Sequence, residues 1–227
     1  MIEIIPTYVP HDSEDLALGA EKVRTFASNI HIDVDDGIFA PHITWPYVRE
    51  GVFDPFDLAA LAALDVEIHL MVAQPREIGM AFARAGALRI LGHVEAFASE
   101  DEAHTTLKEW RKEGASEVGL GILLGTPLEV LDHHRYVVDS VHMMSIATIG
   151  VQGIPYEPSA PERIRALHER YPDILIGVDG GVSPNNIADL VRAGARRFGV
   201  GSAISKSDNP KAAYESIKAL AESATER

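Results

Sequence analysis

Four residues of metal-binding types lie within or directly after short apolar segments of the sequence: His31, Asp33, His69 and Asp179. His31 and Asp33 are two residues apart, so their side chains would project from the same face of an extended strand. Taken singly, a buried histidine is more often a hydrogen-bonded core residue than a ligand, and Asp179, which precedes two glycines, could belong to a simple turn. Together the four residues favour a metal site, because burying them unpaired would be costly and one divalent cation bound to all four would remove that cost.

The available donor atoms restrict which metal could bind. The chain has no cysteine, so thiolate ligands and disulfides are excluded and a metal must be held by nitrogen and oxygen. Two imidazoles and two carboxylates suit zinc, iron(II), manganese or cobalt better than calcium. We therefore predict one divalent metal ion (Zn, Fe, Mn or Co) as the cofactor.

Short β-branched runs alternate with longer segments of helical periodicity along the chain. The predicted strands cover residues 2–5, 30–34, 66–72, 88–94, 118–123, 140–146, 174–178 and 198–201, and the clearest helices cover 13–27, 77–85, 103–112 and 160–171. This alternation implies a parallel sheet with helical crossovers, and eight units predict an α/β fold, a (β/α)8 TIM barrel forming one domain over residues 1–227. An open doubly wound sheet is the alternative, although no Gly-x-Gly-x-x-Gly follows the first strand.

Local signals complete this prediction. Ser159, Ser183 and Asn209 stand just before prolines and are predicted N-caps of helices that begin with those prolines. In a barrel, functional groups gather at the C-terminal ends of the strands, which is where the four candidate ligands fall. His133 and His134 are expected to lie on a solvated helical stretch, as are His104 and His168 on theirs.

Composition and charge limit the possible partners. The 227 residues are 46% hydrophobic and carry a net charge of −14, which argues against nucleic acid or an anionic membrane as a broad partner surface. A small anion remains possible, because backbone amides can hold a phosphate inside an acidic protein. No apolar run reaches the length of a membrane span, so we expect a cytoplasmic protein, and we also expect a homo-oligomer.

Several segments resemble those of a known family in the same order. These are HIDVDDGIFAP at 31–41, EIHLMV at 67–72, HVEA at 93–96, GTP at 125–127, VDGGV at 178–182, AGA at 193–195 and GSAI at 201–204. They are similar to the strand ends of ribulose-phosphate 3-epimerases, and the likeness runs from about residue 6 to residue 204. A pattern spread over so many strands is specific for the superfamily of barrels and less specific for the substrate.

The resemblance implies a chemistry and a set of site residues. His31, Asp33, His69 and Asp179 match the metal ligands of the family, and Asp33 and Asp179 match its acid and base. Inverting a carbon beside a ketone requires a proton to leave one face and another to arrive at the opposite face, with a metal stabilising the enediolate between these steps. The positions implied for substrate or phosphate binding are Thr7, Met71, Met144, Gly180, Gly181, Gly201 and Ser202.

The chain also departs from the family pattern. Asp35 stands where the family usually has methionine, and it should share the inward face of its strand with Asp33, which makes it our candidate for a specificity residue. The Gly-rich phosphate loop of the family is replaced by ATIGVQG at 147–153, which has fewer glycines to let backbone approach an anion. Thr7 and Pro10 replace two serines, and His42 replaces an asparagine.

Three functions are compatible with these observations. The first is a metal-dependent epimerase of a ketose phosphate, and the second is another isomerase or lyase that passes through an enediolate on the same barrel. Asp35 and the altered loop favour some such shift. The third is a non-catalytic sugar-phosphate-binding paralogue, against which the complete set of four ligands argues.

Overall fold

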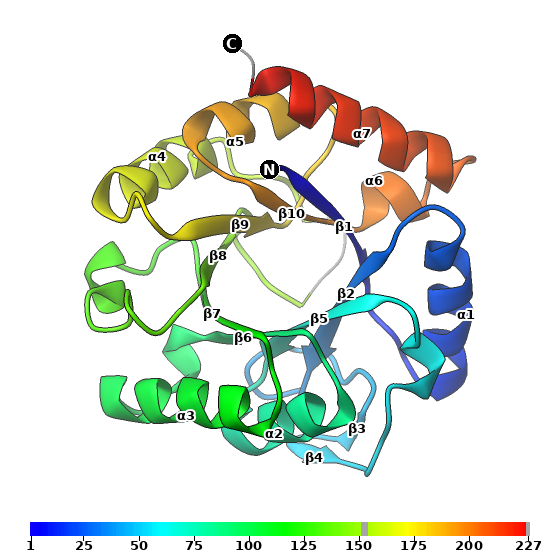
Figure 1. Cartoon of the computed structure of the whole chain (residues 1–227), viewed down its shortest axis with the longest axis vertical. Helices are drawn as coiled ribbons and strands as arrows, with labels where there is room; N and C mark the ends of the chain where they lie inside the picture. Colours follow the sequence, from blue (N-terminus) through cyan, green and yellow to red (C-terminus); the bar gives the residue numbers. More distant parts are fainter. Residues whose placement is uncertain (151–153, 226–227) are drawn as a thin grey trace.

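Eight parallel strands close into a barrel in the computed structural model, which describes residues 1–150 and 154–225 (Figure 1). The order around the barrel is β1-β10-β9-β8-β7-β6-β5-β2. Its strands are β1 (Glu3–Tyr8), β2 (Asn29–Asp35), β5 (Asp65–Met71), β6 (Arg89–His93), β7 (Glu117–Ile122), β8 (Ser140–Met144), β9 (Leu175–Asp179) and β10 (Arg197–Val200). The predicted (β/α)8 barrel is therefore confirmed, and the open sheet is excluded.

Helices surround the barrel and bury its outer face. They are α1 (Ser13–Arg24), α2 (Pro75–Ala85), α3 (Glu100–Glu113), α4 (Ala160–Arg170), α5 (Ile187–Ala193), α6 (Ser202–Ser205) and α7 (Pro210–Ala224), with 3-10 turns η1 (Ala59–Leu61), η2 (Val94–Ala96) and η3 (Leu128–Leu131). A two-stranded sheet of β3 (Tyr47–Arg49) and β4 (Val52–Phe53) lies in the long connection after β2. No helix within 1–150 and 154–225 has both the length and the apolar character that crossing a bilayer demands.

The predicted helix starts were correct at two of three positions, Ser159 and Asn209. Asn209 caps α7, since its side chain accepts a hydrogen bond from the amide of Ala212. Ser159 precedes α4 but makes no side-chain capping bond. Ser183 is not a cap, because its segment forms a turn and α5 begins only after Asn186, whose side chain accepts from the Ser183 amide.

The register of the strands places the candidate residues at neighbouring levels. Thr7 lies beside His31 across β1 and β2, and Asp33 lies beside His69 across β2 and β5. On the other side of the barrel, Met144 lies beside Asp179 across β8 and β9. Residues far apart in sequence thus reach one end of the barrel, where the strands finish.

Candidate active site and metal centre

Two histidines and one aspartate meet inside the barrel. His31 Nε2 lies 3.1 Å from Asp33 Oδ1, and His69 Nδ1 lies 2.9 Å from the same oxygen. Both imidazoles are fully buried. Two ring nitrogens that converge on one carboxylate oxygen are arranged as they would be around a shared cation.

A third imidazole joins this cluster, and sequence reasoning missed it. Donor atoms of His31, His69, His142 and Asp179 all lie within 4.8 Å of one another, and all four residues are buried. His142 lies on β8, two residues before Met144, so its side chain points into the barrel as that of Met144 does. This two-residue spacing was the available signal in the sequence.

The donor set fits a divalent cation. Both ring nitrogens of His142 lack a hydrogen-bond partner among the described residues, which is rare for buried polar atoms. Two carboxylates and three imidazoles provide only oxygen and nitrogen, as zinc, cobalt, iron and manganese accept. The group of mutually close donors contains three of the four predicted ligands, His31, His69 and Asp179, together with His142. Asp33, the fourth predicted ligand, adjoins the group through its contacts with His31 and His69.

Glu67 and His93 contact the His31 and His69 rings at the nitrogen that does not face Asp33. Glu67 Oε1 accepts from His31 Nδ1 at 2.7 Å, which directs His31 Nε2 towards Asp33. His93 Nε2 lies 2.9 Å from His69 Nε2, and His93 Nδ1 lies 3.3 Å from Glu95 Oε2. Such outer partners set the orientation of metal-binding histidines.

These outer residues were not among the predicted site residues. Glu67 stands two residues before His69, and His93 lies in the resembling segment 93–96, so the pattern contained both without assigning either a role.

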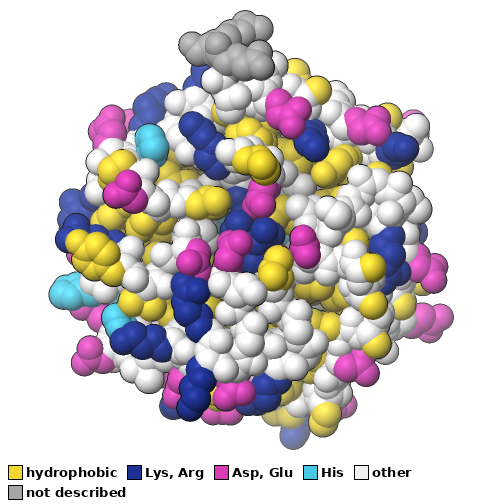
Figure 2. All heavy atoms as spheres, viewed as in Figure 1, with side chains coloured by type: hydrophobic (Ala, Val, Ile, Leu, Met, Phe, Trp, Pro, Cys, Tyr) yellow, Lys and Arg dark blue, Asp and Glu magenta, His cyan; other side chains and the backbone are white. Residues whose placement is uncertain are grey.

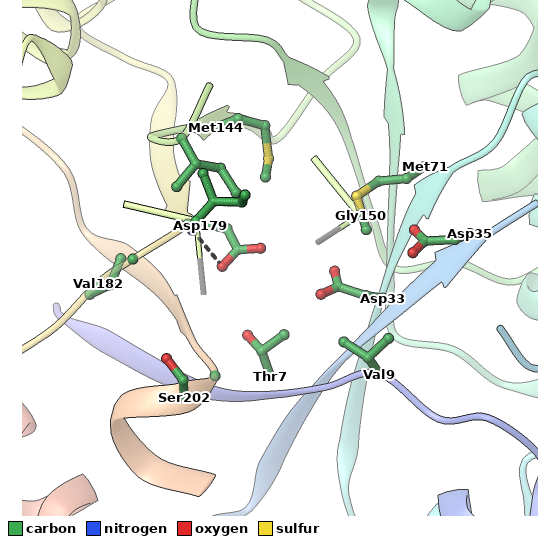
Figure 3. A pocket seen from close by; sticks show the side chains of 15 residues that line it. Thr7, Val9, Asp33, Asp35, Met71, Met144, Gly150, Asp179, Val182 and Ser202 are labelled. Atoms are coloured by element: carbon green, nitrogen blue, oxygen red, sulfur yellow. Dashed lines mark hydrogen bonds between the residues drawn. The ribbon is translucent and has the colours of Figure 1, made fainter. Parts of the chain in front are cut away.

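A pocket opens above the cluster at the C-terminal end of the strands (Figure 3). It brings together every residue predicted for substrate or phosphate binding and all three predicted carboxylates: Thr7, Asp33, Asp35, Met71, Met144, Asp179, Gly180, Gly181, Gly201 and Ser202. Val9, Ile146, Gly150, Ile154 and Val182 complete the lining. Residues 151–153 of the altered loop lie outside the described residues.

Asp33 and Asp179 face one another across this pocket, from β2 and β9 (Figure 3). Burial raises the pKa of Asp179 to about 6, and the nearby charge of Asp33 adds to that rise. Burial also disfavours the Asp33 carboxylate, but hydrogen bonds from His31 and His69 outweigh it and hold the pKa of Asp33 below its ordinary value. The two carboxyl groups thus differ in their affinity for a proton, as a proton-transfer pair requires.

Asp35 is a third buried carboxylate, and it points into the pocket as predicted rather than out to solvent. The residue is 0% exposed, and neither carboxylate oxygen has a hydrogen-bond partner among the described residues. Burial raises its pKa to about 8, and the charges of Asp33 and Asp36 contribute. In Figure 3 it lies beside Asp33, on the side away from Asp179.

Glycines make room for the groups at the end of β9. Gly180 and Gly181 have φ values of +106° and +66°, which strain residues with a side chain. A Cβ atom on Gly199 would lie 3.0 Å from both Asp179 Oδ1 and Thr7 Oγ1. The amide of Gly180 donates to Asp179 Oδ1 at 2.7 Å, so this amide is used to hold the carboxylate.

One of the four histidines predicted to be solvated is not. His134 is fully buried after η3, whereas His133 and His168 are exposed and His104 is half-buried. The segment that carries His134 is a 3-10 turn followed by irregular backbone, so helical periodicity was the wrong guide to its direction.

Comparison with known proteins identifies the family. Residues 3–205 match the model of the ribulose-phosphate 3 epimerase family. Ribulose-phosphate 3-epimerase of Aquifex aeolicus (strain VF5) is 34% identical over 202 residues, which cover 87% of this chain and 86% of that protein. The enzyme of the same name from Bacillus subtilis (strain 168) is 31% identical over 227 residues, covering 95% and 98% of the two chains.

A solved structure supports the fold alone. The crystal structure of 3-hexulose-6-phosphate synthase from Salmonella typhimurium superposes with a TM-score of 0.71 at 14% identity, covering 98% of this chain and 100% of that one. The family match over most of the chain carries the assignment, and this chain belongs to the ribulose-phosphate 3-epimerase family.

Proposed function

We propose that this chain is a divalent-metal-dependent epimerase of a ketose phosphate and transfers protons through Asp33 and Asp179. The observation that carries the proposal is the pair of buried carboxylates that face one another across the pocket, with ring nitrogens converging beneath them. Removing a proton from one face of a carbon and delivering another to the opposite face needs two such groups. The family membership supports the same reaction.

The two carboxyl groups have complementary roles, one as proton acceptor and the other as proton donor. Asp33 is the stronger acid of the two, because its pKa is held below the ordinary value, so its carboxylate can accept a proton from the carbon beside the carbonyl. Asp179 binds a proton more readily than Asp33 in the metal-free site, and it can deliver one from the opposite wall. The roles exchange in the reverse reaction. General acid–base catalysis of this kind contributes about 10²- to 10⁴-fold to a rate.

His31, Asp33, His69 and Asp179 would hold the cation. When bound, it supplies a positive charge that stabilises negative charge developing on the substrate oxygens. The imidazoles of His31 and His69 are kept in place by Glu67 and His93.

The phosphate of the substrate would bind at the ends of β9 and β10. Gly181, Gly201 and Ser202 line the pocket there, and Thr7 lies alongside. Among the described residues that line this pocket there is no Lys or Arg, so backbone amides would carry the interaction. Met71 and Met144 supply apolar walls near the reacting carbons.

Asp35 favours a substrate other than the ordinary pentulose phosphate. An ionised carboxylate near an anionic substrate repels it by a few kcal/mol at several ångströms and an effective dielectric of about 20. Neither Asp35 oxygen has a hydrogen-bond partner among the described residues, so Asp35 must either stay protonated, as its raised pKa of about 8 favours, or accept a hydrogen bond from a substrate hydroxyl. We therefore propose that Asp35 selects a ketose phosphate that places a hydroxyl there, or that the site performs another enediolate reaction.

Replacing Asp35 with methionine tests its role. Methionine removes the repulsion that ionised Asp35 exerts, so turnover of ribulose 5-phosphate should rise in Asp35→Met, and most at pH values where Asp35 has lost its proton. An unchanged kcat/KM, or efficient turnover of ribulose 5-phosphate by the unaltered enzyme, would show that Asp35 does not define the substrate.

Deuterium exchange tests the reaction as a whole. The metal-loaded protein is incubated in D₂O with a panel of pentulose and hexulose phosphates. Uptake of deuterium at the carbon beside the carbonyl supports proton transfer even where net turnover is slow. Binding without exchange for every member of the panel would favour the non-catalytic alternative.

Two further expectations concern the cellular location and the oligomeric state of the protein. We place the protein in the cytoplasm, which is supported by a relative from Oryza sativa that is named a cytoplasmic isoform and is 31% identical over 205 residues. Assembly as a homo-oligomer stays a prediction.

A further inference from the structure

His142 occupies the interior of the barrel without any hydrogen-bond partner among the described residues. It is 1% exposed, and neither Nδ1 nor Nε2 is paired. Buried polar atoms in proteins are paired in the large majority of cases, so an unpaired imidazole at this depth points to a ligand that would satisfy it. An apolar side chain would fill the same space without leaving nitrogen atoms unpaired.

Glycines stand next to His142 on both neighbouring strands. His142 is in register with Gly121 on β7 and with Gly177 on β9. A Cβ atom on Gly177 would lie 2.8 Å from His142 Nδ1, so a side chain there would displace the imidazole. A Cβ atom on Gly121 would instead lie 3.1 Å from His93 Nε2, so it is Gly177 that leaves space for the His142 ring. Barrel interiors are normally filled by branched apolar side chains, and a glycine beside a histidine departs from that pattern.

The ring lies beside the two predicted imidazole ligands. Its centroid is 4.9 Å from that of His69 and 5.3 Å from that of His31, and it stacks on His31 at 24°. Its donor atom belongs to the set within 4.8 Å of one another. Nitrogen and oxygen ligands lie about 2.0–2.2 Å from zinc, so two donors on opposite sides of one ion are about 4.4 Å apart. Shifts of a few tenths of an ångström would let one ion contact the whole set.

Contact with the substrate does not explain His142. Met144, two residues further along β8, lines the pocket, whereas His142 lies one level deeper and is not among the lining residues. We infer that His142 is a fifth protein ligand of the cation, in addition to His31, Asp33, His69 and Asp179. The inference rests on the proposed function, because it concerns the same metal centre.

A third imidazole changes what the centre prefers. Nitrogen-rich sites favour zinc and cobalt over manganese, because imidazole suits the former and oxygen ligands suit the latter. Five protein ligands also leave fewer positions for substrate oxygens than four do. The expected preference of this enzyme is therefore for zinc or cobalt.

X-ray absorption spectroscopy of the zinc-loaded protein tests the inference without relying on activity. The unaltered protein should show three imidazoles around zinc, and His142→Leu should show two. Zinc affinity, measured by competition with a chromogenic chelator, should fall by at least about 10- to 100-fold in His142→Leu, since even loss of an outer partner of a ligand has that effect. Manganese affinity should fall less.

His134→Leu is the matched control. His134 is also buried with both nitrogens unpaired among the described residues, but it belongs neither to the donor set nor to the pocket. Its replacement should leave zinc affinity unchanged.

The outcomes separate the two proposals. Two imidazoles around zinc in the unaltered protein would overturn the inference and leave the proposed epimerase intact, and so would an unchanged zinc affinity in a folded His142→Leu variant. Failure of the unaltered protein to bind any divalent ion would overturn both. If His142→Leu does not fold, the imidazole count in the unaltered protein decides.

Discussion

Buried charge is arranged differently at the two ends of the barrel interior. Where the strands begin, Arg197 and Arg89 alternate with Glu3 and Glu117 in a closed ring of ion pairs. The distances in it are 2.5 Å (Arg197–Glu3), 2.9 Å (Arg197–Glu117), 3.1 Å (Arg89–Glu117) and 3.2 Å (Arg89–Glu3). Figure 2, which looks down the barrel, shows basic and acidic side chains next to each other at the centre of that face.

Where the strands end, three carboxyl groups share a pocket, and the part of its lining that the structure describes includes no Lys or Arg. Asp33 has only imidazole partners, Asp179 accepts from one backbone amide, and Asp35 has no partner among the described residues. Charges at the first end are neutralised within the chain, whereas the carboxylates at the second end require a cation or a proton to neutralise them. The first arrangement serves stability, and the second is available for chemistry.

Removing a carboxylate from the pocket should have the largest effect on activity. Asp33→Asn and Asp179→Asn should each lower kcat by about 10²- to 10⁴-fold or more, because one face of the carbon loses its proton carrier. Steady-state kinetics and the D₂O exchange assay measure this. The metal content of each variant is determined alongside, and near-normal turnover by a fully metallated Asp179→Asn enzyme would remove Asp179 from the mechanism.

Breaking the ring at the other end should act on stability instead. Arg197 is buried and also lies 3.5 Å from Glu67, so Arg197→Met leaves carboxylates uncompensated. The free energy of unfolding in urea should fall by about 3–5 kcal/mol, the usual effect of removing one partner from a buried pair.

Arg192→Met is the control, since Arg192 forms an exposed pair with Asp189 whose loss should change stability by less than about 1 kcal/mol. Equal small losses for Arg192→Met and Arg197→Met would contradict the contrast between the two ends.

The third prediction concerns Asp35 in metal-free protein. Its pKa is about 8 in the folded state and near 3.8 when unfolded, so the folded state binds the extra proton between these values. Its contribution to stability is therefore fully present below about pH 4 and is lost as the pH rises towards 8. Asp35→Asn, which cannot ionise, should become more stable than the parent as the pH rises, by on the order of a few kcal/mol at pH 8.

Thermal unfolding of both proteins from pH 4 to pH 8 measures this difference. Asp173→Asn, at an exposed position, controls for the replacement itself. A difference in Tm between Asp35→Asn and the parent that does not change with pH would show that the Asp35 carboxyl does not titrate as described.

Sequence reasoning recovered the parts of this molecule that depend on local pattern. Alternating apolar runs predicted the barrel, and the two-residue spacing of Asp33 and Asp35 predicted that both point inwards. Adjacent glycines after Asp179 marked the end of β9, where both adopt positive φ.

The features that depend on contacts between strands were missed. His142 sits in an apolar run, and only the register of β8 and β9 reveals Gly177, the glycine that makes room for it beside His31 and His69. The roles of Glu67 and His93 likewise depend on distances across the barrel. Such distances are set by strand tilt and side-chain direction, which no local spacing encodes.

The central claim is that the uncompensated carboxylates at the end of the strands hold a divalent cation. It is tested most directly by anomalous X-ray scattering from crystals of protein never exposed to chelator, together with elemental analysis of the same preparation. The account predicts one anomalous peak between His31 Nε2, His69 Nδ1 and the carboxylates of Asp33 and Asp179, with about one transition-metal ion per chain. An absence of both the peak and the metal would contradict it.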